Sequence, residues 1–285
     1  MESLTTEPLR CILLATDLSA RCDRAQDRAV QLAREHGAKL VAVCVVESSV
    51  GDVLTARRSQ VVDRKAAEHR LRAGLGDVDL PVELVFEHGH AVDIIRKTAA
   101  AHLSDLIVVG VARDETLGRL LVGTTVEKLA REVSLPILVV RERPHHAYRR
   151  MLVGIDFSEG SRQALQTALT LFPDARPTLY HAFSAHKAHA DAVTVDAARQ
   201  AAEAQAADFM KRNAAVANRP DVEWKIEQGL AEDVLPDYVV RHPTELLVVG
   251  THGRTGILRT AIGSVAEQLM QHTPCDVLIV RQQAA

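Results

Sequence analysis

A repeat with a spacing of about 140 residues constrains the fold of this 285-residue chain more than any other feature. The segment Asp105–Gly110 reads DLIVVG, and Glu245–Gly250, 140 residues later, reads ELLVVG. Other matched positions keep offsets of 139 or 140 residues, and a near-constant offset across half a chain indicates a tandem duplication. We therefore predict two domains, 1–145 and 146–285, joined by the polar stretch RPHHAYRR around 143–150.

Each half alternates short apolar runs with longer stretches of helical periodicity. The run Cys11–Ala15 is a typical strand candidate, and the amphipathic stretch after it has a plausible N-cap in Ser19 and a plausible C′ residue in Gly37. Strands that are apolar throughout, rather than alternating, indicate a parallel sheet with both faces covered. The sequence therefore predicts an α/β fold in each half, with helices on both faces of a parallel sheet.

Composition excludes several function classes. The net charge of −3 and the scarcity of aromatic residues argue against a nucleic-acid-binding surface. No apolar run approaches the roughly 20 residues needed to cross a bilayer, and the N-terminus has no signal-peptide core, so we expect no membrane association. The four cysteines include no C-x-x-C pair and are expected to be buried thiols rather than metal ligands. A cytoplasmic location is therefore expected.

Candidate binding features lie where two strands of each half end, at the edge where open parallel sheets bind ligands. Asp17 and Asp156 each follow the first strand of their half. A glycine-bearing loop runs from Gly250 to Gly263, and it leads into a helix start where Ser264 and Glu267 have capping-box spacing. Glycines let backbone amides approach a phosphate, which a helix N-terminus also attracts. The P-loop and G-x-G-x-x-G fingerprints are both absent.

The spacing of the second loop resembles a family motif. Gly250-x2-Gly253, nine further residues and then Gly263-Ser264 match the pattern G-x2-G-x9-G-[ST] of ATP-binding universal stress proteins. The resemblance covers nearly the whole chain as two copies. It implies a doubly wound, five-stranded sheet of strand order 3-2-1-4-5 in each half. It also implies that the halves pack as an intrachain pseudo-dimer through their last strands, and that chains can pair again as a homodimer.

The same resemblance implies a cofactor site for ATP, accompanied by Mg²⁺. Its residues would be Asp156, Ala182, Gly250, Thr251, Gly253, Gly263, Ser264 and Val265. Asp156 would contact the adenosine moiety, and the backbone of Ala182 would contact adenine. The residues after the fourth strand would line ribose and phosphates, and those at the following helix start would hold the phosphates.

The first half departs from the motif. Arg113 stands where the second half has Gly253, and Asp114 and Glu115 follow it. Two carboxylates at this place should repel a triphosphate. We therefore expect a degenerate nucleotide loop in the first domain and an intact one in the second. The alternative, in which Arg113 supplies a phosphate contact, stays open.

The leading functional hypothesis is an ATP-binding sensor or regulator of stress responses, in which bound nucleotide fixes the loop 251–262 and a surface for a regulatory protein partner. One alternative is a slow ATP hydrolase at the same site, for which His252 is the nearby candidate base. A second alternative is a scaffold that binds no nucleotide. We expect no dedicated catalytic residues.

Plainer interpretations accompany these hypotheses. Asp17 and Asp156 are also the residues that an Asx turn or helix cap would need. His181, His186 and His189 could be taken for a zinc cluster, but His181 falls within a predicted strand and the other two in a polar loop. We therefore expect no metal site built from these histidines.

Overall fold

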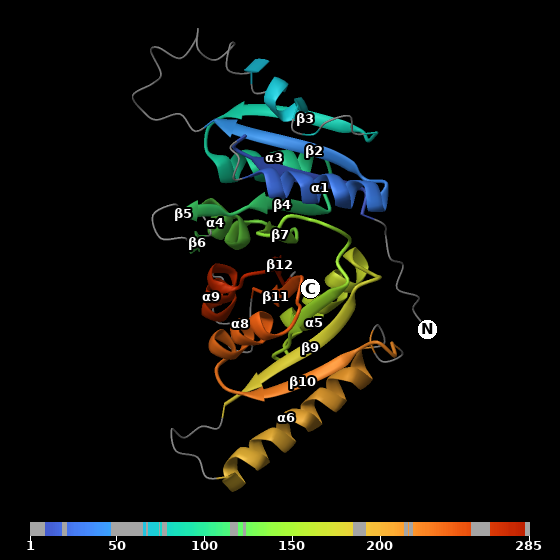
Figure 1. Cartoon of the computed structure of the whole chain (residues 1–285), viewed down its shortest axis with the longest axis vertical. Helices are drawn as coiled ribbons and strands as arrows, with labels where there is room; N and C mark the ends of the chain where they lie inside the picture. The colour runs from blue at the N-terminus through green and yellow to red at the C-terminus, as the bar shows by residue number, and fades with distance from the viewer. Residues whose placement is uncertain are drawn as a thin grey trace. The chain divides into compact units, whose positions relative to one another are not determined.

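The computed structural model describes residues 9–18, 22–46, 65–66, 68–73, 75, 79–114, 119–121, 124–184, 192–213, 216, 219–251 and 263–282. The chain divides into two compact units, Pro8–Ala147 and Tyr148–Ala285, and each is considered by itself (Figure 1). None of the described helices is both long enough and apolar enough to span a membrane.

The first unit contains a parallel five-stranded sheet in the order β3-β2-β1-β4-β7. Its strands are β1 (Cys11–Thr16), β2 (Lys39–Val46), β3 (Val82–His88), β4 (Leu106–Gly110) and β7 (Ile137–Val140). Among its helices are α1 (Asp23–His36), α3 (Ala91–Ala101) and α4 (Thr124–Glu132). Counted along the chain, the sheet order is 3-2-1-4-5, which confirms the prediction.

Helix α1 ends where the sequence predicted. Gly37 adopts a left-handed conformation with φ 64°, and the amide of Ala38 donates to the carbonyl of Ala33. Glycine takes this conformation without the steric cost of a Cβ, which explains the stop. The predicted N-cap, Ser19, lies outside the described residues, and the helix begins at Asp23 after Cys22.

The second unit repeats this arrangement in the order β10-β9-β8-β11-β12. Its strands are β8 (Arg150–Gly154), β9 (Arg176–Phe183), β10 (Glu223–Gln228), β11 (Leu246–Gly250) and β12 (Asp276–Val280). Its helices are α5 (Glu159–Leu171), α6 (Ala192–Arg212), α8 (Ala231–Arg241) and α9 (Ser264–His272). The order is again 3-2-1-4-5, as predicted.

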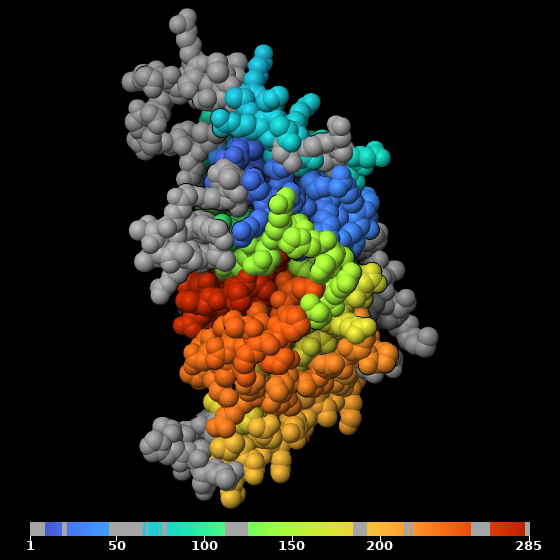
Figure 2. All heavy atoms as spheres, in the orientation of Figure 1, coloured from blue at the N-terminus to red at the C-terminus, as the bar shows by residue number. Residues whose placement is uncertain are grey.

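Helices cover both faces of the second sheet. Consecutive residues of a strand point to opposite faces: the ring of Tyr180 packs against Tyr238 of α8, while that of His181 packs against Phe157, which also meets Phe209 of α6. Figure 2 shows the side chains of α8 and α9, in orange and red, side by side on the surface of this unit. Burial on both faces explains why the predicted strands are apolar throughout.

One element of the first unit was not predicted. Strands β5 (Ala112–Asp114) and β6 (Arg119–Leu121) form an antiparallel hairpin between β4 and α4, where the sequence suggested a loop. Arg113 is the residue that replaces a motif glycine, and its backbone pairs with that of Leu120. In the first unit, part of the segment that joins β4 to α4 is therefore a two-stranded antiparallel ladder.

Candidate functional site

Asp156 lies at the carboxyl end of β8, in a turn that it stabilises itself. Its Oδ1 accepts hydrogen bonds from the Ser158 amide at 3.0 Å and from the Ser158 hydroxyl at 2.5 Å. Ser158 is in turn the N-cap of α5 and accepts from the Ser161 amide at 3.2 Å. The Asx turn weighed in the sequence is therefore present. The half-buried carboxylate of Asp156 is fixed at the sheet edge.

The residue after Asp156 has an unusual backbone. Phe157 adopts φ 64°, and Leu18, which follows Asp17 in the first unit, adopts φ 60°. Residues other than glycine rarely enter this left-handed region, because it costs roughly 1–2 kcal/mol. The same strained backbone conformation therefore follows the aspartate in both copies. Strain of this kind clusters at functional sites.

A pocket of about 250 Å³ opens at this edge of the second sheet. Seven of the eight residues predicted for the cofactor site line it: Asp156, Ala182, Gly250, Thr251, Gly263, Ser264 and Val265. The eighth, Gly253, lies outside the described residues, as does His252. The topology thus brings together residues that are separated by more than 100 positions in sequence.

Two neighbours of Ala182 on β9 complete one wall of the pocket. The Tyr180 hydroxyl donates to the Glu227 carboxylate at 2.9 Å. Burial raises the pKa of Tyr180, and the hydrogen bond to Glu227 raises it further. The Nδ1 of His181 lies 2.7 Å from the carbonyl of Ile155. Because a carbonyl oxygen only accepts, Nδ1 carries the proton in this bond. Both rings are therefore held in place before any ligand arrives.

The glycine at the end of β11 has a packing reason. A Cβ at Gly250 would lie 3.0 Å from the backbone carbon and oxygen of Gly160, at the start of α5. Such an approach leaves no room for a side chain. Next to it, the buried Thr251 donates its amide to Val280 and accepts from the Gly263 amide at 2.8 Å. The first bond ties the end of β11 to β12, and the second ties it to the start of α9.

Helix α9 begins differently from the predicted capping box. Gly263 is the N-cap and makes no side-chain cap, and Ser264 is the first helical residue. The first intrahelical bond runs from the amide of Glu267 to the carbonyl of Gly263. The capping-box prediction is therefore wrong, because glycine supplies no capping oxygen and Ser264 sits one position too late. The amides of the first three helical residues have no intrahelical acceptor and lie beside the pocket.

Of the three histidines that could be taken for a zinc cluster, one lies within the described part of the chain. His181 is buried and bonded to a backbone carbonyl, while His186 and His189 fall outside the described residues. Over the residues that the structure does describe, no group of three or more metal-ligating side chains is found.

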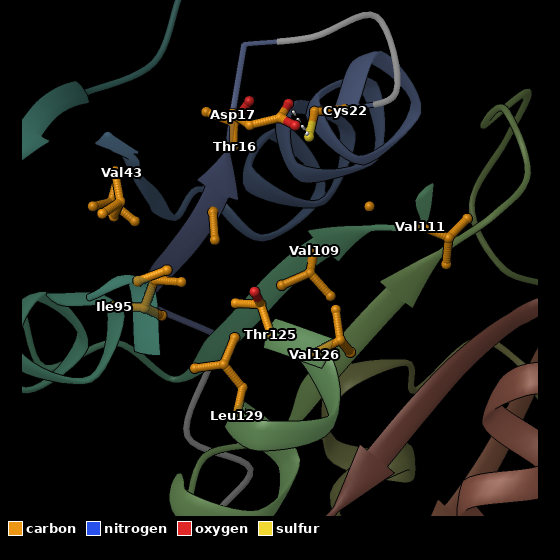
Figure 3. A pocket seen from close by; sticks show the side chains of 14 residues that line it. Thr16, Asp17, Cys22, Val43, Ile95, Val109, Val111, Thr125, Val126 and Leu129 are labelled. Atoms are coloured by element: carbon orange, nitrogen blue, oxygen red, sulfur yellow. Dashed lines mark hydrogen bonds between the residues drawn. The ribbon is translucent and has the colours of Figure 1, made fainter. Parts of the chain in front are cut away.

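The first unit has a pocket at the equivalent edge (Figure 3), with a volume of about 370 Å³. It is lined by Ala15, Thr16, Asp17, Cys22, Val43, Val45, Ala91, Ile95, Val109, Gly110, Val111, Thr125, Val126 and Leu129. Asp17 stands where Asp156 does in the second unit, and Val43 stands where Tyr180 does. The side chain of Arg113 and the residues Glu115 and Gly123 are not among those described.

Sequence reasoning missed Tyr180, which lines the second pocket, and the left-handed backbone of Leu18 and Phe157, which follow the aspartates of the two pockets. The residue types alone could not predict a left-handed backbone at Leu18 or Phe157, since leucine and phenylalanine both disfavour that conformation. The available signal was positional, because Asp17-Leu18 and Asp156-Phe157 are matched dipeptides of the duplication.

The model of the Universal stress protein family matches twice, over residues 8–141 and 147–281. Universal stress protein E of Salmonella typhi is 24% identical over 254 residues, which cover 81% of this chain and 78% of that protein. The protein of the same name from Escherichia coli (strain K12) is 41% identical over 56 residues, covering 20% of this chain and 18% of that protein.

Solved structures show the same fold. A universal stress protein from Archaeoglobus fulgidus superposes with a TM-score of 0.71 at 16% identity, covering 96% of this chain and 98% of the other. A putative universal stress protein from Pseudomonas aeruginosa gives a TM-score of 0.66 at 18% identity, with 97% and 94% covered. At these identities the similarity concerns the fold.

Proposed function

Since the chain belongs to the universal stress protein family, which its model matches in both halves, we propose that the second unit binds ATP with Mg²⁺ and that the protein regulates a stress response through this nucleotide. Adenine would lie against the backbone of Ala182 and the ribose near Asp156 and Gly250. The phosphates would meet the start of α9. A regulatory protein would bind the second unit when its nucleotide site is occupied.

The start of α9 carries this proposal. The amides of Ser264, Val265 and Ala266 have no intrahelical acceptor, and the N-cap Gly263 has no side chain to occupy them. Free amides and the positive end of the helix dipole form an anion site. All four residues line the pocket that also contains Asp156. An anion site joined to a hydrogen-bonding carboxylate suits a ligand with phosphates at one end and hydroxyl groups near the other.

The decisive experiment is calorimetric titration of the full-length protein with Mg²⁺–ATP, comparing the wild type with Gly263→Val. Gly263 has φ −59°, which any residue adopts, and a Cβ there would lie 3.3 Å from the Thr251 carbonyl. The fold should therefore tolerate valine with a small adjustment, while its branches crowd the phosphates. Loss of charge-assisted hydrogen bonds worth about 1.5–3 kcal/mol predicts a 10- to 100-fold weaker affinity, roughly.

Gly123→Val is the matched control, because Gly123 is the equivalent residue of the first half. One ATP per chain, weakened by Gly263→Val and unchanged by Gly123→Val, supports the proposal. Equal loss in both variants would assign nucleotide to both units, and unchanged affinity in Gly263→Val would place the site elsewhere. Release of ADP during the same titration would favour the hydrolase, and absence of any binding would favour the scaffold.

A further inference from the structure

The pocket of the first unit differs in chemistry from its counterpart, although the duplication preserves its position. Val43 stands where Tyr180 stands, Val111 where Thr251 stands, and Cys22 where Ser161 stands. Each exchange removes a hydroxyl group from the lining. Thr125 replaces a valine and Thr16 an isoleucine, but the Thr16 hydroxyl already accepts from the Leu18 amide at 3.0 Å.

The interior of this pocket is apolar. The side chains of Ile95, Val109, Val126 and Leu129 converge on it from α3, β4 and α4 (Figure 3), and all four residues are buried. Removing an apolar ligand surface from water against such a lining is favourable. The volume of about 370 Å³ lies within the range of small-molecule sites. The interior therefore suits a compact apolar body.

Three polar side chains gather at one end, while the hydroxyl-bearing Thr125 lies near Val126 and Leu129 (Figure 3). Thr16, Asp17 and Cys22 lie together in Figure 3, and the Cys22 thiol donates to Asp17 Oδ1 at 3.2 Å. Burial raises the pKa of Cys22 to about 11, and the charge of Asp17 adds to the effect, so the thiol stays neutral at pH 7. Among the described residues that line this pocket, Asp17 is the charged one and none is basic.

We propose that the first-unit pocket binds a small primary amine with a compact apolar body. The ammonium group would meet the carboxylate of Asp17, and the body would lie over Ile95 and Leu129. Asp17 is exposed and lines the pocket, and its carboxylate attracts a cation and repels phosphates. The two units would therefore serve different ligands, an anion in the second and a cation in the first.

Three probes of similar size and different charge test this assignment: benzylamine, benzyl alcohol and phenylacetate. Each is titrated into full-length protein carrying ¹³C-labelled Ile, Leu and Val methyl groups. We expect saturable shifts of the Ile95 and Leu129 methyls with benzylamine, and roughly tenfold weaker binding of the alcohol, as for loss of one charge-assisted hydrogen bond. Phenylacetate should bind more weakly still. A saturating concentration of ATP should displace none of the amine.

Matched variants locate the charge. Asp17→Asn should weaken benzylamine about tenfold while leaving benzyl alcohol unchanged, and Asp156→Asn in the second unit should change neither. Val43→Tyr, which introduces the ring of Tyr180, should fill the pocket and weaken both probes. The proposal would be overturned if phenylacetate bound as tightly as benzylamine, or if no saturable shifts appeared. It would also be overturned if Asp156→Asn, and not Asp17→Asn, weakened the binding of benzylamine. If Asp17→Asn does not fold, the order of the three probes on the wild type decides.

Discussion

The pockets at the equivalent sheet edges of the two units have the same backbone geometry and differ in their side chains. In both, an aspartate follows the first strand, a residue with φ near 60° comes next, and a helix starts within the next few residues. The second pocket adds Tyr180 and Thr251, whereas the first has Val43 and Val111 in their places. The duplication has therefore preserved the backbone geometry at this edge of the sheet while the side chains that line the pocket have diverged. Function must for this reason be argued from each site and not from the fold.

The largest effect is expected at Gly250, where the comparison can be tested on stability. Gly250→Ala places a Cβ 3.0 Å from the backbone of Gly160, which cannot move without shifting α5. Overpacking of this kind costs about 1–3 kcal/mol in the free energy of unfolding. Urea unfolding of the full-length protein, followed by circular dichroism, measures the cost.

Gly154→Ala is the control for this variant, since Gly154 lines the same pocket and its added Cβ would find no atom closer than 3.7 Å. We expect its stability to stay within about 0.5 kcal/mol of the wild type. Equal stability of the two variants would show that Gly250 is not required by its contact with α5. Its glycine would then have to be explained by a ligand alone.

A smaller difference is expected between the two left-handed residues. Phe157 is supported by rings at centroid distances of 4.3 Å (His181) and 6.2 Å (Trp224). Phe157→Asn relieves the backbone but loses these contacts, for a net loss of about 1–2 kcal/mol, whereas Leu18→Asn should stay within about 0.5 kcal/mol. The fluorescence of Trp224, the only tryptophan of the chain, should change in the first variant alone. A larger loss from Leu18→Asn would reverse the comparison.

Much of the fold could be predicted from the sequence because its signals are local. The apolar run that became β11 and the glycine that ends α1 each have a direct structural cause, namely burial on both sheet faces and a left-handed C-cap. The sheet order came from the resemblance to a family, since no residue pattern specifies which strands become neighbours. The β5–β6 hairpin was missed because its strands are three residues each and polar in part.

The candidate site could be predicted as a set of residues but not as a geometry. The motif identified Gly263 and Ser264, yet their roles at the start of α9 are shifted by one position from the capping box that the sequence suggested. The packing of Gly250 on Gly160 depends on two backbones far apart in sequence, and no local pattern reports such an approach. Nucleotide binding by these residues stays a prediction.

The smallest expected effect concerns the thiols around Asp17, and it tests whether the charge of this carboxylate reaches into the first pocket. Burial, with the charge of Asp17 added to it, raises the pKa of both Cys22 and Cys44 to about 11. Only the thiolate reacts with iodoacetamide, so both cysteines should be alkylated slowly at pH 8 and faster as the pH approaches 11. Asp17→Asn removes a negative charge that opposes ionisation, so it should lower both pKa values and speed alkylation at pH 8, as measured by mass spectrometry of peptides. Because burial is the larger cause, the pKa of each thiol should stay above its ordinary value.

Asp156→Asn in the second unit is the control and should leave both alkylation rates unchanged. Equal acceleration by the two variants would indicate loosening of the protein and not the field of Asp17.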